Sequence, residues 1–103
     1  YITDMVNGFM AVLRSNVSGE ILNLGGGPEH SIQEVIECIF STADADPNQV
    51  NWGALPYREG EVQRFVGNHT KTENLLNFRA KIGLEEGLRA TIAWWRERAA
   101  SED

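Results

Sequence analysis

The residues best suited to bind a ligand lie in the polar segment Arg58-Glu59-Gly60-Glu61, directly after the apolar Leu55-Pro56-Tyr57. The guanidinium of Arg58 carries parallel N–H donors that can grip a diphosphate. The carboxylate of Glu61, three residues later, could accept hydrogen bonds from a ribose diol. Exposed charged loops are more often simply solvated, and the local sequence leaves that plainer interpretation open.

A second candidate is the glycine turn Gly25-Gly26-Gly27, which ends the short apolar run of residues 21–24 and precedes a helix start at Ser31. Glycines between a strand and a helix allow the backbone to approach a phosphate closely. The third glycine of the dinucleotide fingerprint is absent from the residues that follow. A plain strand-to-helix turn is therefore the leading interpretation of this segment.

The other residues that carry chemistry form no recognised pattern. We treat His30 and His69 as isolated histidines, and we predict no metal site from them. Residues 44–48 imitate the beginning of a calcium loop, but Gln49 and Leu55 stand where that loop needs its glycine and its glutamate. No Ser/His/Asp or Cys/His arrangement can be assigned to defined elements, so no catalytic nucleophile is predicted.

The composition limits the classes of partner. The chain has 103 residues, which fits one small domain, and its formal net charge is −6. An acidic chain repels phosphate polyanions, so no nucleic-acid partner is expected. No apolar run reaches the roughly 18 residues of a membrane span, so no membrane partner is expected either. The single cysteine, Cys38, cannot form an internal disulfide, which favours a reducing, cytoplasmic setting.

Hydrophobic periodicity predicts about four helices. We expect Asp4 to cap the first helix, which runs to about Arg14. The sequence Ser31-Ile32-Gln33-Glu34 has the pattern of a capping box and opens the second helix. Two further helices are expected at about 70–76 and 84–99, and the buried stripe of the last one is expected to include Trp95.

Three apolar segments between these helices indicate strands. Residues 21–24 predict a buried strand, residues 50–55 a second short strand, and residues 62–66 a further extended piece. Strands alternating with helices are typical of layered folds. The sequence therefore predicts an α/β or α+β domain with a small sheet of two or three strands.

Six short motifs follow one another in a fixed order over essentially the whole chain: Tyr1-Ile2-Thr3-Asp4, residues 21–27, Ser31-Ile32-Gln33-Glu34, residues 55–62, Thr70-Lys71 and residues 84–95. Their order resembles the C-terminal portion of the extended short-chain dehydrogenase/reductase superfamily. The closest resemblance is to its NAD-dependent sugar-nucleotide epimerases and dehydratases. The last motif matches the family pattern Leu-Glu-Glu-Gly-Leu-x-x-Thr-Ile-x-Trp-Tyr almost residue for residue, whereas residues 76–80 depart from the usual Leu-Gly-Trp-x-Pro.

This resemblance implies a substrate site without catalytic groups. Arg58 would contact the diphosphate of a nucleotide-sugar and Glu61 its ribose, while Asn23 and Gly25 would border the cleft. The family's dinucleotide loop and catalytic Tyr-x-x-x-Lys belong to its N-terminal part, and neither tyrosine of this chain has a lysine four residues on. We therefore expect no catalytic residue, metal or cofactor in this chain. NAD or NADP would belong to a full-length parent.

Two functions remain open at this point. The chain is either the sugar-nucleotide-binding segment of such an epimerase or dehydratase, or a free-standing interaction and oligomerisation module derived from one. Without the parent's sheet, the apolar side chains of the first helix would be exposed, among them Val6, Phe9, Met10 and Leu13. An exposed apolar patch and an open strand edge both favour pairing of copies, so a homodimer is expected.

Overall fold

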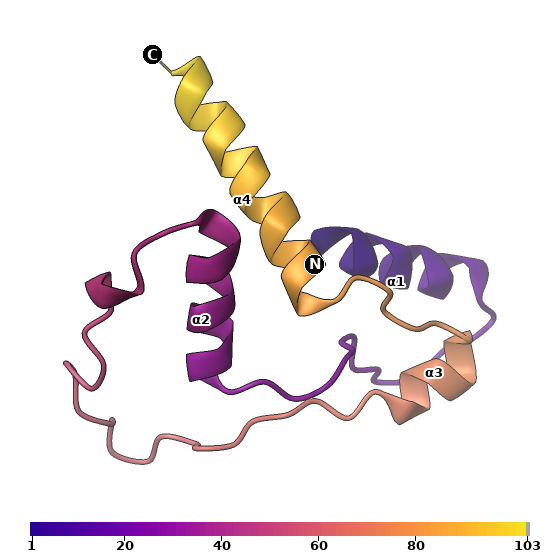
Figure 1. Ribbon diagram of the computed structural model, residues 1–103. Helices are drawn as coiled ribbons and strands as arrows, with labels where there is room; N and C mark the ends of the chain where they lie inside the picture. The colour runs from indigo at the N-terminus through magenta and orange to yellow at the C-terminus, as the bar shows by residue number, and fades with distance from the viewer. Residues whose placement is uncertain (103) are drawn as a thin grey trace. The chain divides into compact units, whose positions relative to one another are not determined.

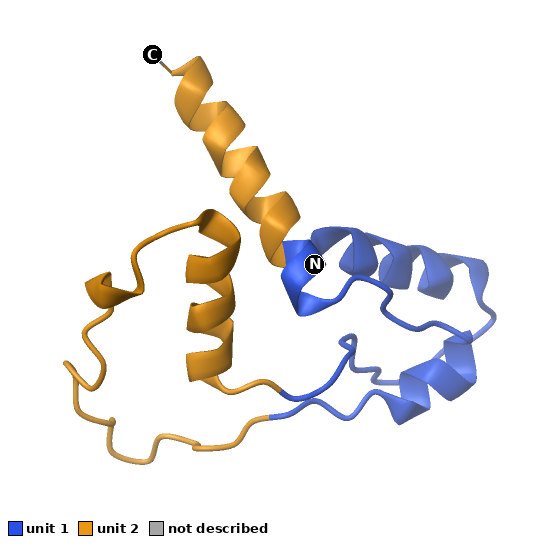
Figure 2. Ribbon diagram, in the orientation of Figure 1, with its two compact units in different colours: residues 1–29, 66–87 blue, residues 30–65, 88–103 orange. Residues whose placement is uncertain are grey.

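The computed structural model describes residues 1–102 and is helical (Figure 1). In chain order its elements are α1 (Ile2–Arg14), α2 (Ile32–Ala43), the 3₁₀ turn η1 (Pro47–Gln49), α3 (Thr70–Leu76) and α4 (Leu84–Ser101). The chain divides into two compact units (Figure 2). Unit 1 holds residues 1–29 and 66–87, and unit 2 holds residues 30–65 and from 88 onward, so that the boundary falls inside α4.

The predicted sheet is wrong, because no β-strand occurs within residues 1–102. The segments 21–24, 50–55 and 62–66 are irregular, and the side chains of Ile21 and Leu55 are 89% and 86% exposed. A strand is held by a ladder of hydrogen bonds to a neighbouring strand. An apolar run shows that a segment suits burial, but it does not supply that neighbour, and the described residues form no such ladder.

Helix α1 begins earlier than its sequence predicts. The carbonyl of Tyr1 accepts hydrogen bonds from the N–H groups of Asp4 and Met5, so the helix starts at Ile2 and Asp4 lies inside it. The predicted N-cap role of Asp4 is therefore wrong. One face of α1 packs onto unit 1, where Gly8 lies close against the side chains of Leu24 and Phe78.

Helix α3 has the predicted bounds, and its ends follow local rules. The side-chain oxygen of Asn68 accepts a hydrogen bond from the N–H of Thr70 and satisfies one free donor of the first turn. At the other end Asn77 adopts a left-handed conformation, with φ of 49°, which stops the helix. A short irregular connection, residues 77–83, leads from there to α4.

Unit 2 contains the clearest helix of the sequence, and its predicted capping box is confirmed. The hydroxyl of Ser31 accepts from the N–H of Glu34 at 3.1 Å, and the Glu34 carboxylate accepts from the N–H of Ser31 at 2.6 Å. The other end of α2 stops at Asp44, which has φ of 53°. There the guanidinium of Arg96 donates to the carbonyl of Ala43 at 2.6 Å, a favourable place for a cation.

Burial in this chain is unusual for a folded domain. Among the described residues no apolar side chain is buried, whereas Asp4 and Thr72 are 7% and 1% exposed. The apolar stripe of α4 is only half-buried at Leu84, Leu88 and Ile92, and Trp95, predicted to be part of it, is 62% exposed. Polar contacts rather than a hydrophobic core therefore define the arrangement of unit 1.

Candidate functional site

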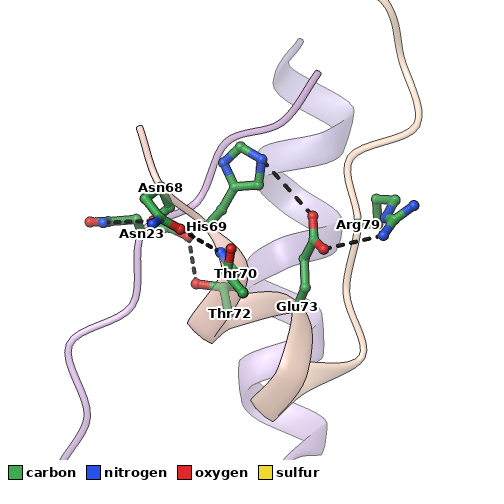
Figure 3. Close-up of polar contacts among 7 residues, drawn as sticks. All are labelled: Asn23, Asn68, His69, Thr70, Thr72, Glu73 and Arg79. Carbon is green, nitrogen blue, oxygen red and sulfur yellow. Dashed lines mark hydrogen bonds and ion pairs between the residues drawn. The ribbon is translucent and has the colours of Figure 1, made fainter. Parts of the chain in front are cut away.

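The best-defined polar cluster of unit 1 centres on Asn23, one of the predicted substrate residues (Figure 3). The Asn23 side-chain amide donates to the carbonyl of Asn68 at 3.1 Å, and the hydroxyl of Thr72 donates to the Asn23 carbonyl at 2.6 Å. Thr72 comes from α3, so these two bonds tie the segment before the glycine turn to that helix. The Asn23 side-chain oxygen has no partner among the described residues and can accept a hydrogen bond from a ligand.

Three charged or titratable side chains form a chain beside this cluster (Figure 3). The Nε2 atom of His69 lies 3.9 Å from a carboxylate oxygen of Glu73, and the other oxygen of Glu73 lies 3.2 Å from the guanidinium of Arg79. His69 and Glu73 are four residues apart across the start of α3, so their side chains share a helix face. The carboxylate thus has a cation on one side and an imidazole on the other.

The contact between His69 and Glu73 corrects the prediction that His69 is isolated. Glu73 stands four residues after His69, which is a signal that helical spacing supplies. The contact to Arg79 gives no comparable signal because residues 77–82 form an irregular segment. His69 and Glu73 remain two groups only, and the described chain holds no cluster of three or more His, Cys, Asp or Glu side chains that could bind a metal ion.

The glycine turn of unit 1 fits tightly against its own chain. A Cβ atom on Gly26 would lie 2.5 Å from the Cβ of Ala80, so the absence of a side chain there serves internal packing. Gly25 is less crowded, since a Cβ atom on it would lie 3.7 Å from the Nδ1 atom of His69. Gly25 and Gly26 also border a small cavity of about 80 Å³.

Asp4 organises the wall of the same cavity. Its two carboxylate oxygens accept hydrogen bonds from the backbone N–H groups of Lys81 and Ile82 at 3.0 and 2.9 Å. The bond from Lys81, more than any other contact, lowers the pKa of Asp4 below its usual value, and it outweighs the desolvation that raises it. Both oxygens are engaged, so Asp4 is a structural anchor of unit 1.

In unit 2 the predicted substrate residues Arg58 and Glu61 share one tight turn. The N–H of Glu61 donates to the carbonyl of Arg58 at 3.1 Å, and a Glu61 carboxylate oxygen accepts from the N–H of Arg58 at 3.0 Å. Gly60 supplies the positive φ of 75° that this turn requires. Both side chains are exposed, and the Arg58 guanidinium makes no hydrogen bond or ion pair with another residue of the described chain. The turn therefore presents a free guanidinium next to a fixed carboxylate.

The four predicted substrate residues thus fall into two local pairs. Asn23 and Gly25 belong to unit 1, and Arg58 and Glu61 belong to unit 2. Within each pair the residues lie on one short segment. Their joint contact with a substrate stays a prediction.

Comparison with known proteins supplies the context for these pairs. The chain is 31% identical over 100 residues to a dTDP-glucose 4,6-dehydratase of Streptomyces griseus, a match covering 94% of this chain and 29% of the relative. The chain is homologous to the extended short-chain dehydrogenase/reductases. A UDP-N-acetyl-alpha-D-glucosaminuronate decarboxylase of Bacillus cytotoxicus is also 31% identical, with 94% of this chain and 31% of the relative covered.

A relative from a third organism gives the same result. A UDP-glucuronic acid decarboxylase 1 of Danio rerio is 34% identical over 95 residues, covering 92% of this chain and 22% of the relative. The chain therefore spans less than a third of the length of each of these short-chain dehydrogenase/reductase relatives. No protein-family model matches it, and no solved structure matches it either. Within the part that the structure describes, no helix is both long and apolar enough to cross a membrane.

Proposed function

We propose that the chain is the C-terminal, sugar-nucleotide-binding segment of an NAD(P)-dependent nucleotide-sugar epimerase or dehydratase, and that it carries no catalytic residue of its own. The observation that carries this proposal is the similarity along 92–94% of the chain to relatives whose names specify dTDP- and UDP-sugars. We expect a cytoplasmic location, as the sequence indicates. NAD or NADP would belong to a full-length parent.

The turn of unit 2 supports the proposal chemically. The unpaired guanidinium of Arg58 offers parallel donors of the geometry that a diphosphate accepts. One oxygen of Glu61 is held by the N–H of Arg58, which leaves its second oxygen for the hydroxyls of a ribose. Because the two residues share one turn, their side chains could contact two adjacent parts of a nucleotide-sugar.

Asn23 and Gly25 are the proposed substrate residues of unit 1. The Asn23 amide is held by Asn68 and its carbonyl by Thr72, so its free side-chain oxygen has a defined place. Because Gly25 has no side chain, the space beside the His69 ring stays open. Such groups suit hydroxyl recognition on the sugar, and they contain no general acid or base of the parent's tyrosine–lysine type.

Titration calorimetry with GDP-, UDP- and dTDP-sugars tests the proposal. Arg58→Ala is expected to weaken binding by about 1.5–3 kcal/mol, the contribution of a hydrogen bond to a charged group. Arg58→Lys is expected to recover only part of this because the planar fork is lost. The matched control is Arg14→Ala, which removes a cation from the end of α1 in unit 1. Equal affinity of wild type and Arg58→Ala would remove Arg58 from the site, and no binding of any nucleotide-sugar would contradict the function.

The second candidate function is an interaction and oligomerisation module that no longer binds nucleotide. It is favoured by one observation, the exposed apolar side chains along α1, which include Phe9 and Leu13 at 60% and 77% exposure. The same titrations separate the two functions, because a pure interaction module gives no heat with any nucleotide-sugar. Neither function predicts that the purified chain transfers hydride to NAD. The absorbance of the reduced cofactor would detect such a transfer.

A further inference from the structure

His69 turns one ring nitrogen toward Glu73 and leaves the other one free. Its Nε2 atom lies 3.9 Å from a carboxylate oxygen of Glu73, and its Nδ1 atom points away from that carboxylate (Figure 3). Among the described residues Nδ1 has no hydrogen-bond partner. The His69 side chain is 24% exposed, so a small group of a ligand can reach it.

The carboxylate of Glu73 favours one tautomer of the His69 ring. A neutral imidazole carries its proton on one nitrogen and accepts a hydrogen bond with the other. The negative charge beside Nε2 stabilises the tautomer that has its proton on Nε2. The guanidinium of Arg79, 3.2 Å from the other oxygen of Glu73, holds this carboxylate in place. In the neutral ring Nδ1 is therefore an acceptor.

Gly25 leaves the approach to this acceptor open. A Cβ atom on Gly25 would lie 3.7 Å from Nδ1 of His69, which is ordinary van der Waals contact. With only a hydrogen atom at Gly25, that space is left for an atom of a ligand. Asn23, two residues earlier on the same segment, carries a second free acceptor in its side-chain oxygen. All of these residues belong to unit 1.

The free atoms of Asn23 and His69 limit the chemistry of the ligand. Both accept hydrogen bonds, so the group that binds them has to donate. A diphosphate offers acceptor oxygens, and the carboxylate of Glu73 adds a negative charge that repels it. A hexose offers hydroxyl donors and carries no charge. Of the parts of a nucleotide-sugar, the hexose therefore fits this side of unit 1.

We propose that Nδ1 of His69 accepts a hydrogen bond from a hydroxyl group of the hexose of a nucleotide-sugar. His69 is then a third substrate residue of unit 1, beside Asn23 and Gly25. Glu73 is a positioning residue, because it acts on the ligand only through the ring of His69. This inference rests on the proposed sugar-nucleotide binding, and it adds which part of the ligand unit 1 recognises.

Calorimetric titrations with dTDP-glucose and with dTDP, which lacks the hexose, test this assignment. His69→Phe keeps a ring without nitrogen atoms, and it is expected to weaken the binding of dTDP-glucose about 3–10-fold, the effect of one neutral hydrogen bond. The binding of dTDP should not change. His69→Asn places an amide acceptor near the position of Nδ1 and should recover part of the loss. The matched control is His30→Phe in unit 2, which is expected to bind both ligands as wild type does.

A double-mutant cycle tests the approach past Gly25. Gly25→Ala adds a methyl group at ordinary contact distance from Nδ1, so the turn keeps its shape while the acceptor is covered. The variant is expected to weaken the binding of dTDP-glucose as His69→Phe does. In the double variant the second change should add no further loss, because both changes remove the same hydrogen bond.

Nuclear magnetic resonance of the imidazole nitrogens detects the contact in the wild-type chain. At pH 8, where an ordinary imidazole is neutral, Nδ1 of His69 is expected to be the unprotonated nitrogen. Its nitrogen-15 resonance should move toward the protonated range when dTDP-glucose is added and should stay in place with dTDP. The spectrum of His69→Phe identifies the resonance.

The outcomes separate this inference from the proposed function. The inference alone is overturned if the wild type binds dTDP-glucose and His69→Phe binds it equally, or if the Nδ1 resonance does not move. Equal losses for dTDP and dTDP-glucose would assign His69 a structural role and overturn it too, as would full additivity of the cycle with Gly25→Ala. A wild type that binds no nucleotide-sugar overturns the inference and the proposed function together.

Discussion

The carboxylate of Asp4 accepts a hydrogen bond from the backbone N–H of Ile82 at 2.9 Å, joining residues 78 positions apart in the sequence. Its second oxygen accepts from the neighbouring N–H of Lys81. This pair of bonds fastens the start of α1 to the segment that leads into α4. In a unit without a buried apolar side chain, a fully satisfied carboxylate is one of the few fixed points, which makes it a sensitive place to perturb.

The stability of unit 1 is expected to fall in acid because of Asp4. The pKa of Asp4 is lowered in the folded chain from its usual value near 3.8. A carboxyl group whose pKa is lower in the folded chain than in the unfolded chain stabilises the fold at a pH above its unfolded pKa. This contribution is lost as the pH falls through the folded pKa. The urea concentration at the midpoint of unfolding, followed by circular dichroism, should therefore decrease when the pH falls below about 4.

The variant Asp4→Asn tests this origin of the acid sensitivity. An amide has one acceptor oxygen, so one of the two N–H groups loses its partner and the variant is expected to be about 1.5–3 kcal/mol less stable at pH 7. The difference from wild type should shrink as the pH falls through the lowered folded pKa of Asp4, because the wild-type carboxylate then becomes protonated and neutral. A difference that stays constant from pH 7 to pH 2 would show that Asp4 titration does not contribute.

Thr72 is expected to hold the segment around Asn23 through its hydroxyl rather than through its methyl group. It is 1% exposed, and its hydroxyl donates to the Asn23 carbonyl at 2.6 Å. Thr72→Val keeps the shape and removes the donor, which leaves a carbonyl unsatisfied at a cost of about 1–3 kcal/mol. The control Thr72→Ser keeps the hydroxyl and should retain most of the stability in urea unfolding. Equal losses in the two variants would assign the effect to packing.

Gly26 is expected to tolerate no side chain. A Cβ atom there would lie 2.5 Å from the Cβ of Ala80, too close for either backbone segment to stay in place. Gly26→Ala should lower the free energy of unfolding by about 1–3 kcal/mol, as overpacking does elsewhere. The matched control is Gly67→Ala in the same unit, where an added Cβ atom meets nothing within 4 Å. Thermal unfolding of both variants separates a local clash from a general intolerance of glycine replacement.

The helices of this chain were predictable where their signals are local. The capping box at Ser31 and the bounds of α3 lie within a few residues of the groups that form them, and the structure confirms both. The predicted strands failed because a strand depends on a neighbour elsewhere in the chain, which an apolar pattern such as that of residues 21–24 does not reveal. The role of Asp4 was missed for the same reason, since its partners are 77 and 78 residues away.

In the candidate site too, contacts between residues close in sequence were predictable and contacts across irregular segments were not. The turn that joins Arg58 and Glu61 involves residues three apart, and the sequence already placed them together. The contact of Glu73 with Arg79 crosses an irregular segment and could not be predicted, whereas the spacing of His69 and Glu73 could have been. The substrate roles of Asn23, Gly25, Arg58 and Glu61 come from family resemblance and remain predictions.

The capping box of α2 offers a test in unit 2 that does not depend on any ligand. The Ser31 hydroxyl satisfies the N–H of Glu34, one of the donors that the first turn of a helix leaves free. Ser31→Ala removes this acceptor and should lower the free energy of unfolding by about 1 kcal/mol, while Ser31→Asp should restore most of it. The matched control is Ser41→Ala, which changes an exposed serine within the same helix, where alanine is the better helix former.

Hydrogen exchange of the amides in α2 reads this effect locally. In Ser31→Ala the first turn of the helix is expected to lose protection, since the N–H of Glu34 no longer has its acceptor, while α3 in unit 1 keeps its wild-type protection. Ser41→Ala should leave protection at both helices unchanged or slightly raised. If Ser31→Ala and Ser41→Ala alter the exchange of the first turn of α2 to the same extent, the capping box does not stabilise the helix.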